Sequence, residues 1–186
     1  VSHRGYVDSL GSFWIFGEVE NNGTVNLEWV KVNAKLYDEN NALVGTESSF
    51  IDLDIILPRE KSPFSILILN APSIDHYELK VVGYDITFEQ PYRDFEILSH
   101  SSSIDALGWL NVIGEIKNTG AKTVEFIKIS ATFYDADGKV VATDWTYAEE
   151  DVIAPNETGT FEVTLIYKDL VPLVDHYAIQ IQGKPI

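Results

Sequence analysis

Acidic side chains gather at two places where a divalent cation could bind. Asp135 and Asp137 precede Gly138 with the spacing that begins a calcium loop, and Glu149, Glu150 and Asp151 form a continuous run. A calcium loop also needs oxygen ligands at alternate positions and a glutamate at its last position. Counted from the first aspartate, lysine and threonine occupy two of those positions, so this stretch is interpreted as a hairpin turn. The acidic run is interpreted as a solvated bend, and the alternative is a metal site to which another loop contributes oxygen ligands.

The residue types that catalysis needs are few and do not occur in the required spacing. The 4 histidines form two pairs far apart in the sequence, and none has the close spacing of metal ligands on one element. There is no cysteine and no Gly-x-Ser-x-Gly turn, which excludes a thiol nucleophile and the serine elbow of hydrolases. A glycine-rich phosphate loop is also absent. The sequence therefore predicts no catalytic residue, no cofactor and no enzymatic activity.

Aromatic residues are the other candidate functional group, because they contribute much of the binding energy at many protein contacts. When the two halves of the chain are aligned, Trp14, Trp109 and Trp145 each stand opposite an asparagine or a serine. A side chain that the fold required would occur in both halves, so these tryptophans are interpreted as specific to one half. Phe16 shares a strand face with Trp14 and is expected to point outward with it. These four residues are the candidate partner contacts, and the alternative, which the sequence favours, is packing between the two halves or local cover.

Two Asn-x-Thr triplets, at residues 22–24 and 156–158, lie in expected turns. This triplet is the acceptor for N-linked glycosylation in exported proteins. Asn22 and Asn156 are therefore candidate glycosylation sites, and they favour a location outside the cytoplasm.

The chain contains one stretch twice, and the structural units that this repeat indicates must position the candidate residues named above. Residues 17–64 align without a gap on residues 114–161, and 16 of the 48 aligned pairs are identical. An internal repeat of this length indicates two structural units of the same fold. The predicted domains are residues 1–90 and 91–186, and the expected junction is residues 89–93.

Hydrophobic and polar residues alternate in several stretches, as in half-buried β-strands. In residues 13–20 every second residue is expected to face the core, including Gly17, and Gly114 has the same place in the second copy. An inward glycine predicts that a bulky neighbour packs over bare backbone. Hairpin turns are expected at Asn41 and Gly138, because asparagine and glycine best tolerate a positive φ.

The whole pattern is that of an all-β protein. No stretch has sustained helical periodicity, and each copy has about seven short strand-like runs separated by turn signals. Two tandem immunoglobulin-like β-sandwich domains, related by the internal repeat, are the predicted fold. Residues 1–8 align on residues 98–105, so the first strand of copy one is expected to be cut short.

The net charge of −16 restricts the partners that this chain can have. Both halves are acidic, whereas binding to nucleic acid or to anionic lipid needs clustered lysine and arginine. No apolar run approaches the roughly 20 residues of a membrane span. The sequence therefore predicts no nucleic-acid partner and no membrane insertion. Because the chain begins at Val1 without a methionine, a removed upstream segment is expected, such as a signal peptide or an anchor.

The paired Gly-Glu, Asn-x-Gly and Tyr-Asp segments of the two copies resemble the FxLYD domain family. The eponymous motif is kept in part, since residues 34–38 read Ala-Lys-Leu-Tyr-Asp and residues 131–135 read Ala-Thr-Phe-Tyr-Asp. Alanine stands where the family has phenylalanine. The resemblance covers nearly the whole chain. It implies small immunoglobulin-like domains of bacterial or archaeal extracytoplasmic proteins, and it implies no catalytic residue.

Together these features predict a non-enzymatic, extracytoplasmic binding or spacer module. Its partner would be a protein or another cell-surface component, and affinity would come from exposed aromatic residues or from an unpaired sheet edge. The alternative is a structural stalk or surface-layer component that associates with copies of itself.

Overall fold

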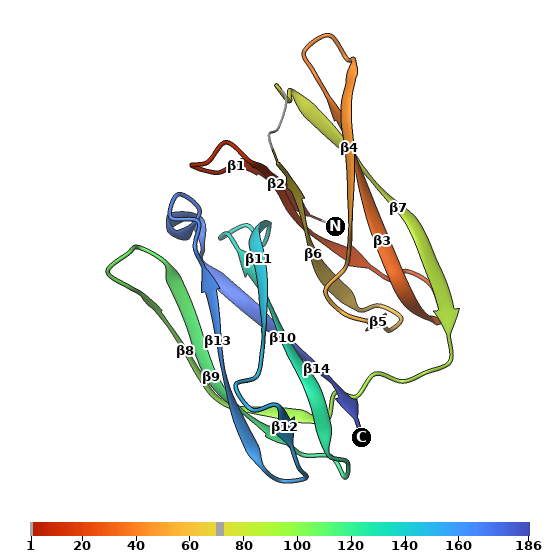
Figure 1. The fold of residues 1–186 in the computed structure, drawn as a ribbon, viewed down its shortest axis with the longest axis vertical. Coiled ribbons are helices and arrows are strands. Elements are labelled where there is room, and N and C mark those ends of the chain that lie inside the picture. The colour runs from red at the N-terminus through yellow and green to blue at the C-terminus, as the bar shows by residue number, and fades with distance from the viewer. Residues whose placement is uncertain (1, 70–72) are drawn as a thin grey trace. The chain divides into compact units, whose positions relative to one another are not determined.

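Antiparallel β-strands make up nearly all of the computed structural model, which describes residues 2–69 and 73–186 (Figure 1). The chain divides into two units, Val1–Glu89 and Gln90–Ile186, which we call domain one and domain two. Domain one contains β1 (His3–Val7), β2 (Phe13–Glu20), β3 (Asn26–Tyr37), β4 (Leu43–Phe50), β5 (Ile55–Ile56), β6 (Lys61–Ile68) and β7 (His76–Thr87). Domain two contains β8 (Phe95–Ile104), β9 (Leu110–Asn118), β10 (Val124–Tyr134), β11 (Val140–Tyr147), β12 (Val152–Ile153), β13 (Thr158–Leu165), the short 3₁₀ helix η1 (Val171–Leu173) and β14 (His176–Pro185).

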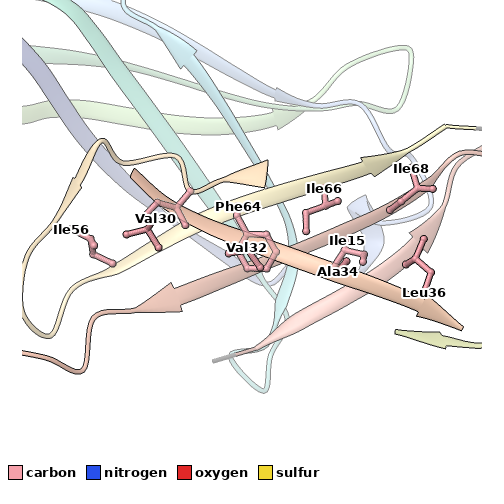
Figure 2. Close-up of a cluster of buried hydrophobic side chains, with 10 residues drawn as sticks. Ile15, Val30, Val32, Ala34, Leu36, Ile56, Phe64, Ile66 and Ile68 are labelled. Atoms are coloured by element: carbon pink, nitrogen blue, oxygen red, sulfur yellow. The ribbon is translucent and has the colours of Figure 1, made fainter. Parts of the chain in front are cut away.

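Domain one is a sandwich of two sheets. One sheet has the order β1-β2-β6, and in the other β3 pairs with β7 along one edge and with β4 and β5 along the opposite edge. The inward side chains of β2, β3 and β6 interdigitate to form the core (Figure 2). This cluster consists of Ile15, Val30, Val32, Ala34, Leu36, Ile51, Ile56, Phe64, Ile66 and Ile68.

Domain two repeats the same arrangement. Its first sheet has the order β13-β9-β8, and β10 is the centre of the second sheet, with β14, β11 and β12 as partners. The buried apolar residues of β9, β10 and β13 stand at the positions that form the core of domain one. The predicted all-β fold of two tandem sandwiches is confirmed. Within the described residues no helix is long and apolar enough to span a bilayer.

The two expected hairpin turns have the predicted backbone. Asn41 has φ 58° and Gly138 has φ 73°. Each stands three residues after an aspartate, Asp38 or Asp135, whose carboxylate accepts N–H groups of the same turn. At Asp135 these donors are the N–H groups of Asp137 and Lys139, at 3.1 and 2.9 Å. Local hydrogen bonding of this kind is the usual role of aspartate in a turn. The hairpin interpretation of this acidic stretch is therefore confirmed.

The two inward glycines also have the predicted neighbours. A Cβ atom placed on Gly17 would lie 2.7 Å from the Phe64 ring, and one placed on Gly114 would lie 2.6 Å from the Phe161 ring. The register explains both contacts, because each glycine is paired directly with that phenylalanine on the adjacent strand. The ring thus lies over bare backbone in each domain.

The prediction that Phe16 is exposed is wrong. The alternation itself holds, since Ile15 belongs to the core cluster and Phe16 lies on the opposite face of β2. Phe16 is nevertheless only 1% exposed. The Trp14 ring lies parallel to it at a centroid distance of 5.7 Å, and β2 is flanked by β1 and β6. Alternation assigns a residue to a face of the sheet, but it does not say what covers that face.

Candidate functional site: exposed aromatic clusters

The central strand of each domain has a bulge that turns an aromatic residue outward. The pairing of β3 with β7 shifts between Glu28 and Lys31, and that of β10 with β14 shifts between Glu125 and Lys128. A bulge places two residues of one strand opposite one residue of the other and re-aims the side chains. The residues turned outward are Trp29 in domain one and Phe126 in domain two.

Trp29 and Phe126 have a backbone conformation that bulky residues rarely adopt. Their φ angles are 55° and 49°, and their side chains are 65% and 61% exposed. A non-glycine residue in this region costs on the order of 1 kcal/mol and persists where its surroundings enforce it. Both copies keep this strained, exposed aromatic residue at the same position of the repeat. Such outliers are concentrated at functional sites.

In domain one the outward residue belongs to a small cluster on β3 and β4. The Trp29 and Phe50 rings meet edge to face with centroids 6.1 Å apart. Lys31 is paired with Phe50 across the strands, and its Nζ lies 5.6 Å from the centre of that ring. We call these three residues the aromatic–lysine cluster of domain one.

Domain two has the corresponding cluster on β10 and β11, with one ring more. Lys128 is paired with Tyr147, as Lys31 is with Phe50 in domain one. Its Nζ lies 4.3 Å from the centre of the Trp145 ring, which meets the Tyr147 ring edge to face at 5.4 Å. The aromatic–lysine cluster of domain two consists of Phe126, Lys128, Trp145 and Tyr147, since Phe126 and Tyr147 line the same hollow.

A shallow hollow of about 370 Å³ adjoins the cluster of domain two. Phe126 and Tyr147 contribute aromatic walls, and Glu150 and Asp151 contribute acidic ones. Two members of the predicted acidic run therefore lie beside exposed rings, whereas Glu149 lines a different hollow. The hollow can receive an apolar group together with a positively charged one.

The acidic run is not arranged around one point. The Glu150 carboxylate accepts the N–H of Thr160 at 2.7 Å, and Glu149 donates its own N–H to the Thr160 carbonyl at 2.9 Å. Among the described residues no three acidic or histidine side chains are placed to hold one metal ion. The local role of this run is to join the bend after β11 to β13.

The other two predicted tryptophan contacts have local partners. Trp14 donates its indole N–H to the Asp8 carboxylate at 3.0 Å, in the β1–β2 hairpin. In domain two the corresponding hydrogen bond comes from Asn111 to Asp105, at 3.4 Å. Trp109 is half-buried and donates its backbone N–H to the same Asp105 carboxylate at 3.0 Å. Neither residue belongs to an aromatic–lysine cluster, so only Trp145 of the four predicted contacts lies in the candidate site.

The candidate glycosylation sites lie in exposed turns. Asn22 follows β2, and Asn156 follows β12 with a φ of 68°. The backbone N–H of Asn156 donates to the carbonyl of Asn118 at 2.8 Å, and the residues Asn22 and Asn156 are both exposed. Both side chains are accessible to modification.

Sequence reasoning missed Trp29, Phe126 and Phe50. The available signal was a slip in the alternation, because Leu27 and Val30 both pack toward the core although they are three residues apart. A strand without a bulge would place them on opposite faces. The same slip occurs between Val124 and Ile127 in the second copy.

Asp144, next to Trp145, makes the stability of domain two dependent on pH. Burial raises the pKa of its carboxyl to about 6 from an ordinary value of 3.8, although the Trp145 N–H, donated at 2.8 Å, acts in the opposite direction. The folded pKa lies above the unfolded one, so the folded domain holds this proton more tightly. Stability from this group is complete below about pH 4 and is lost as the pH rises through about 6.

We expect Asp144→Asn to raise the free energy of unfolding at pH 7.5 by on the order of 2 kcal/mol. Asparagine has the same shape, keeps an acceptor for the Trp145 N–H and carries no buried charge. At pH 4 the gain should be small. Urea denaturation at the two pH values measures the difference, and Glu47→Gln, at the exposed equivalent position of domain one, is the matched control. An equal gain at both pH values would contradict the assignment to ionisation.

Comparisons with known proteins do not identify the chain. No family model matches it, and no curated protein matches its sequence. Among solved structures it is similar to the exo-chitosanase CsxA of Amycolatopsis orientalis, with 11% identity and a TM-score of 0.34 over 98% of this chain and 25% of that one. It is also similar to a β-glucuronidase from glycoside hydrolase family 2, with 14% identity and a TM-score of 0.26 over 82% of this chain and 20% of that one.

The chain spans a quarter or less of the length of these two structures. At such TM-scores the likeness carries no argument about function. The resemblance to the FxLYD family stays a prediction.

Proposed function

We propose that this chain is a non-enzymatic binding module of an extracytoplasmic protein, and that it contacts a partner protein through the aromatic–lysine clusters of its two domains. The observation that carries the proposal is repeated at the same place in both domains: a strained, exposed aromatic residue lies on the central strand, and a lysine of that strand lies over an aromatic ring of the adjacent strand.

The clusters have the composition of protein contact sites. Exposed aromatic rings grouped on one surface mark interaction sites more often than scattered ones do. Tryptophan and tyrosine are enriched among the residues that dominate binding energy, since they bury a large area at little cost in conformational entropy. A lysine held against a ring adds a positive charge to an otherwise acidic surface. The fold does not need these rings, because the core lies on the other face of β3.

A location outside the cytoplasm fits the two exposed acceptor sites for glycosylation, Asn22 and Asn156, and the absence of cysteine does not oppose it. A module with two similar clusters gains avidity when both are engaged by a partner with repeated sites. The role as a spacer is compatible with the same proposal, since spacer domains hold such sites away from an anchor.

The test uses the cell envelope of the producing organism as the source of partner. The biotinylated full chain is incubated with intact envelope and its retention is measured for the wild type and for the triple variant Trp29→Ser, Phe126→Ser and Trp145→Ser. We expect at least about tenfold weaker retention of the variant, which corresponds to about 1.4 kcal/mol. Phe88→Ser is the control, because Phe88 is 93% exposed and lies outside both clusters.

Equal retention of the wild type and the triple variant would refute the proposal. Sedimentation velocity between about 1 and 100 µM separates it from the self-associating alternative. We expect a monomer at all concentrations. Association that disappears in the triple variant would instead make the clusters contacts between copies of the chain, as in a stalk or surface layer.

A further inference from the structure

The hollow of about 370 Å³ in domain two combines exposed aromatic rings with carboxylates. Phe126 and Tyr147 line it, and both are exposed. Ala148 gives it a small apolar wall, and Glu150 and Asp151 give it acidic ones. These residues come from the bulge of β10 and from the stretch that ends β11 and leads to β12. The hollow is therefore built by two segments of one domain.

Larger apolar side chains stand at the corresponding positions of domain one. Ile51 is the counterpart of Ala148 in the repeat, and Leu53 is the counterpart of Glu150. Both are buried hydrophobic residues. Each domain forms its sandwich with its own residues at these positions, so the fold does not require the alanine and the glutamate. These two differences give domain two both the space and the charge of the hollow.

Carboxylates outnumber cations around this hollow. One oxygen of Glu150 accepts a backbone N–H of β13 at 2.7 Å, which fixes the side chain and leaves its other oxygen available. Asp151 is exposed, and within the described residues no hydrogen bond or ion pair holds its carboxylate. Glu125 also lines the hollow and is paired across the strands with Lys184, whose Nζ lies 5.9 Å from the centre of the Phe126 ring. One lysine thus faces three carboxylates.

Aromatic walls beside carboxylates fit a guanidinium group better than an ammonium group. A guanidinium is planar and stacks on aromatic faces, and its fork of N–H donors matches the oxygens of a carboxylate. It is also more weakly hydrated than an ammonium, so less hydration is lost when it enters a hollow. A neutral apolar side chain would leave the carboxylates without a partner. The hollow therefore favours arginine over lysine and over an uncharged side chain.

We propose that this hollow binds an arginine side chain of the partner protein. The guanidinium packs against the Phe126 and Tyr147 rings. Its N–H groups donate to the Glu150 and Asp151 carboxylates, and its methylene groups lie along Ala148. The inference rests on the proposed function, because both rings belong to the aromatic–lysine cluster of domain two, and it names the chemistry of the partner there. The net charge of −16 favours the same partner, since an acidic surface attracts a basic segment.

The probe is the capped pentapeptide Gly-Gly-Arg-Gly-Gly, added to the ¹⁵N-labelled full chain in about 0.15 M salt, which screens distant surface charges. We expect saturable shifts of the amide signals of Phe126, Tyr147 and Asp151, with a Kd of about 1 mM. A peptide with lysine should bind at least about threefold more weakly, because it lacks the planar face and the paired donors. A peptide with citrulline, which has nearly the same shape without the charge, should bind at least about tenfold more weakly.

Variants of the chain locate the site. Ale148 is avoided as a deletion, and Ala148→Ile instead introduces the residue of domain one, which should fill the hollow and remove binding. Asp151→Asn removes one charge at the hollow and should weaken binding at least about fourfold. Glu149→Gln is the matched control, because it removes one charge from the same acidic run but lines a different hollow, and it should change the Kd by less than about 1.5-fold. The ¹⁵N spectrum of each variant without peptide reports whether domain two is intact, and Asp151→Asn keeps the test decisive if isoleucine disturbs the fold.

Absence of saturable shifts in domain two at a peptide concentration of about 10 mM would overturn the proposal. Equal binding of the arginine and citrulline peptides would overturn it as well, and so would equal binding to the wild type and to Asp151→Asn. A lysine peptide that binds as tightly as the arginine peptide would overturn the choice of arginine.

Retention on the cell envelope separates this inference from the proposed function. If the triple variant loses retention while Ala148→Ile is retained like the wild type, the clusters contact the partner and the arginine inference is overturned. If the peptide binds as expected while the wild type and the triple variant are retained equally, the proposed function is refuted and the arginine site remains.

Discussion

Replacement of Asn118 by alanine is expected to lower the free energy of unfolding of domain two by about 4 kcal/mol. Asn118 is fully buried at the end of β9. Its Nδ2 donates to the carbonyls of Lys122 and Ile153 at 2.8 and 3.0 Å, and its Oδ1 accepts from Gly120 and from Tyr92 at 3.1 and 2.7 Å. One side chain thus satisfies four groups on three different segments.

The size of this effect follows from what alanine leaves behind. A buried polar group without a partner costs about 1–3 kcal/mol. The hydrogen bond from Asn118 to the carbonyl of Ile153 is buried, so alanine would leave this carbonyl without that partner. The Tyr92 hydroxyl has a second, longer contact with the Lys122 carbonyl at 3.4 Å, so part of its bonding can be recovered. The removed amide also leaves a cavity. These contributions are coupled because they share one side chain, so they do not add fully.

Native-state hydrogen exchange measures the change for each domain separately, since it reports opening free energies of individual amides. The most protected amides of β9, β10 and β13 should lose about 4 kcal/mol of protection, and those of domain one should not change. Asn21→Ala is the matched variant in domain one, where the side chain makes three of the four bonds, and its cost should be smaller. A cost below about 1 kcal/mol for Asn118→Ala would show that water replaces the amide.

The contrast between Asn118 and Asn41 shows how far turn chemistry could be predicted from the sequence. Asn41 was interpreted as a residue that tolerates a positive φ, and its φ of 58° confirms this. Asn21 and Asn118 begin the paired Asn-x-Gly segments of the sequence, and in the structure each is buried and forms several hydrogen bonds. The sequence shows that an asparagine is present in both copies. It does not show which carbonyl groups the fold brings to it from residues that are distant in sequence.

The same limit applies to the candidate site. Alternation predicts a strand over residues 13–20, and β2 has these bounds, because alternation is a local property. Trp145 was found because it breaks the symmetry of the repeat. Trp29 and Phe126 keep that symmetry, so a comparison of the two copies does not single them out, although the bulge places them outside. For Phe16 the error is the opposite one, because the residue is expected to be exposed and is buried. Exposure depends on what packs against a face of the sheet and not on the face alone.

Gly114→Ala is expected to destabilise domain two by about 3 kcal/mol, at the upper end of what overpacking costs. The added Cβ would lie 2.6 and 2.7 Å from two atoms of the Phe161 ring and 2.8 Å from the backbone carbonyl oxygen of Ser99. The ring could rotate or shift, but the carbonyl belongs to β8, which is held in the ladder with β9. At Gly17 the third neighbour is a side-chain atom, the Cβ of His3 at 3.0 Å, and not a backbone oxygen at 2.8 Å, so Gly17→Ala should cost less.

Urea denaturation and hydrogen exchange of the domain-two amides together measure the cost of Gly114→Ala. The control is Gly83→Ala, a strand glycine whose added Cβ would have only Lys31 within reach, at 4.0 Å. It should be neutral within about 0.5 kcal/mol. Addition of Phe161→Leu to Gly114→Ala should recover part of the loss, because the ring atoms that meet the new methyl group are gone, whereas Phe161→Leu alone should destabilise. Equal costs for Gly114→Ala and Gly83→Ala would mean that β8 and the ring move aside freely, and that the glycine is not required by the packing of Phe161.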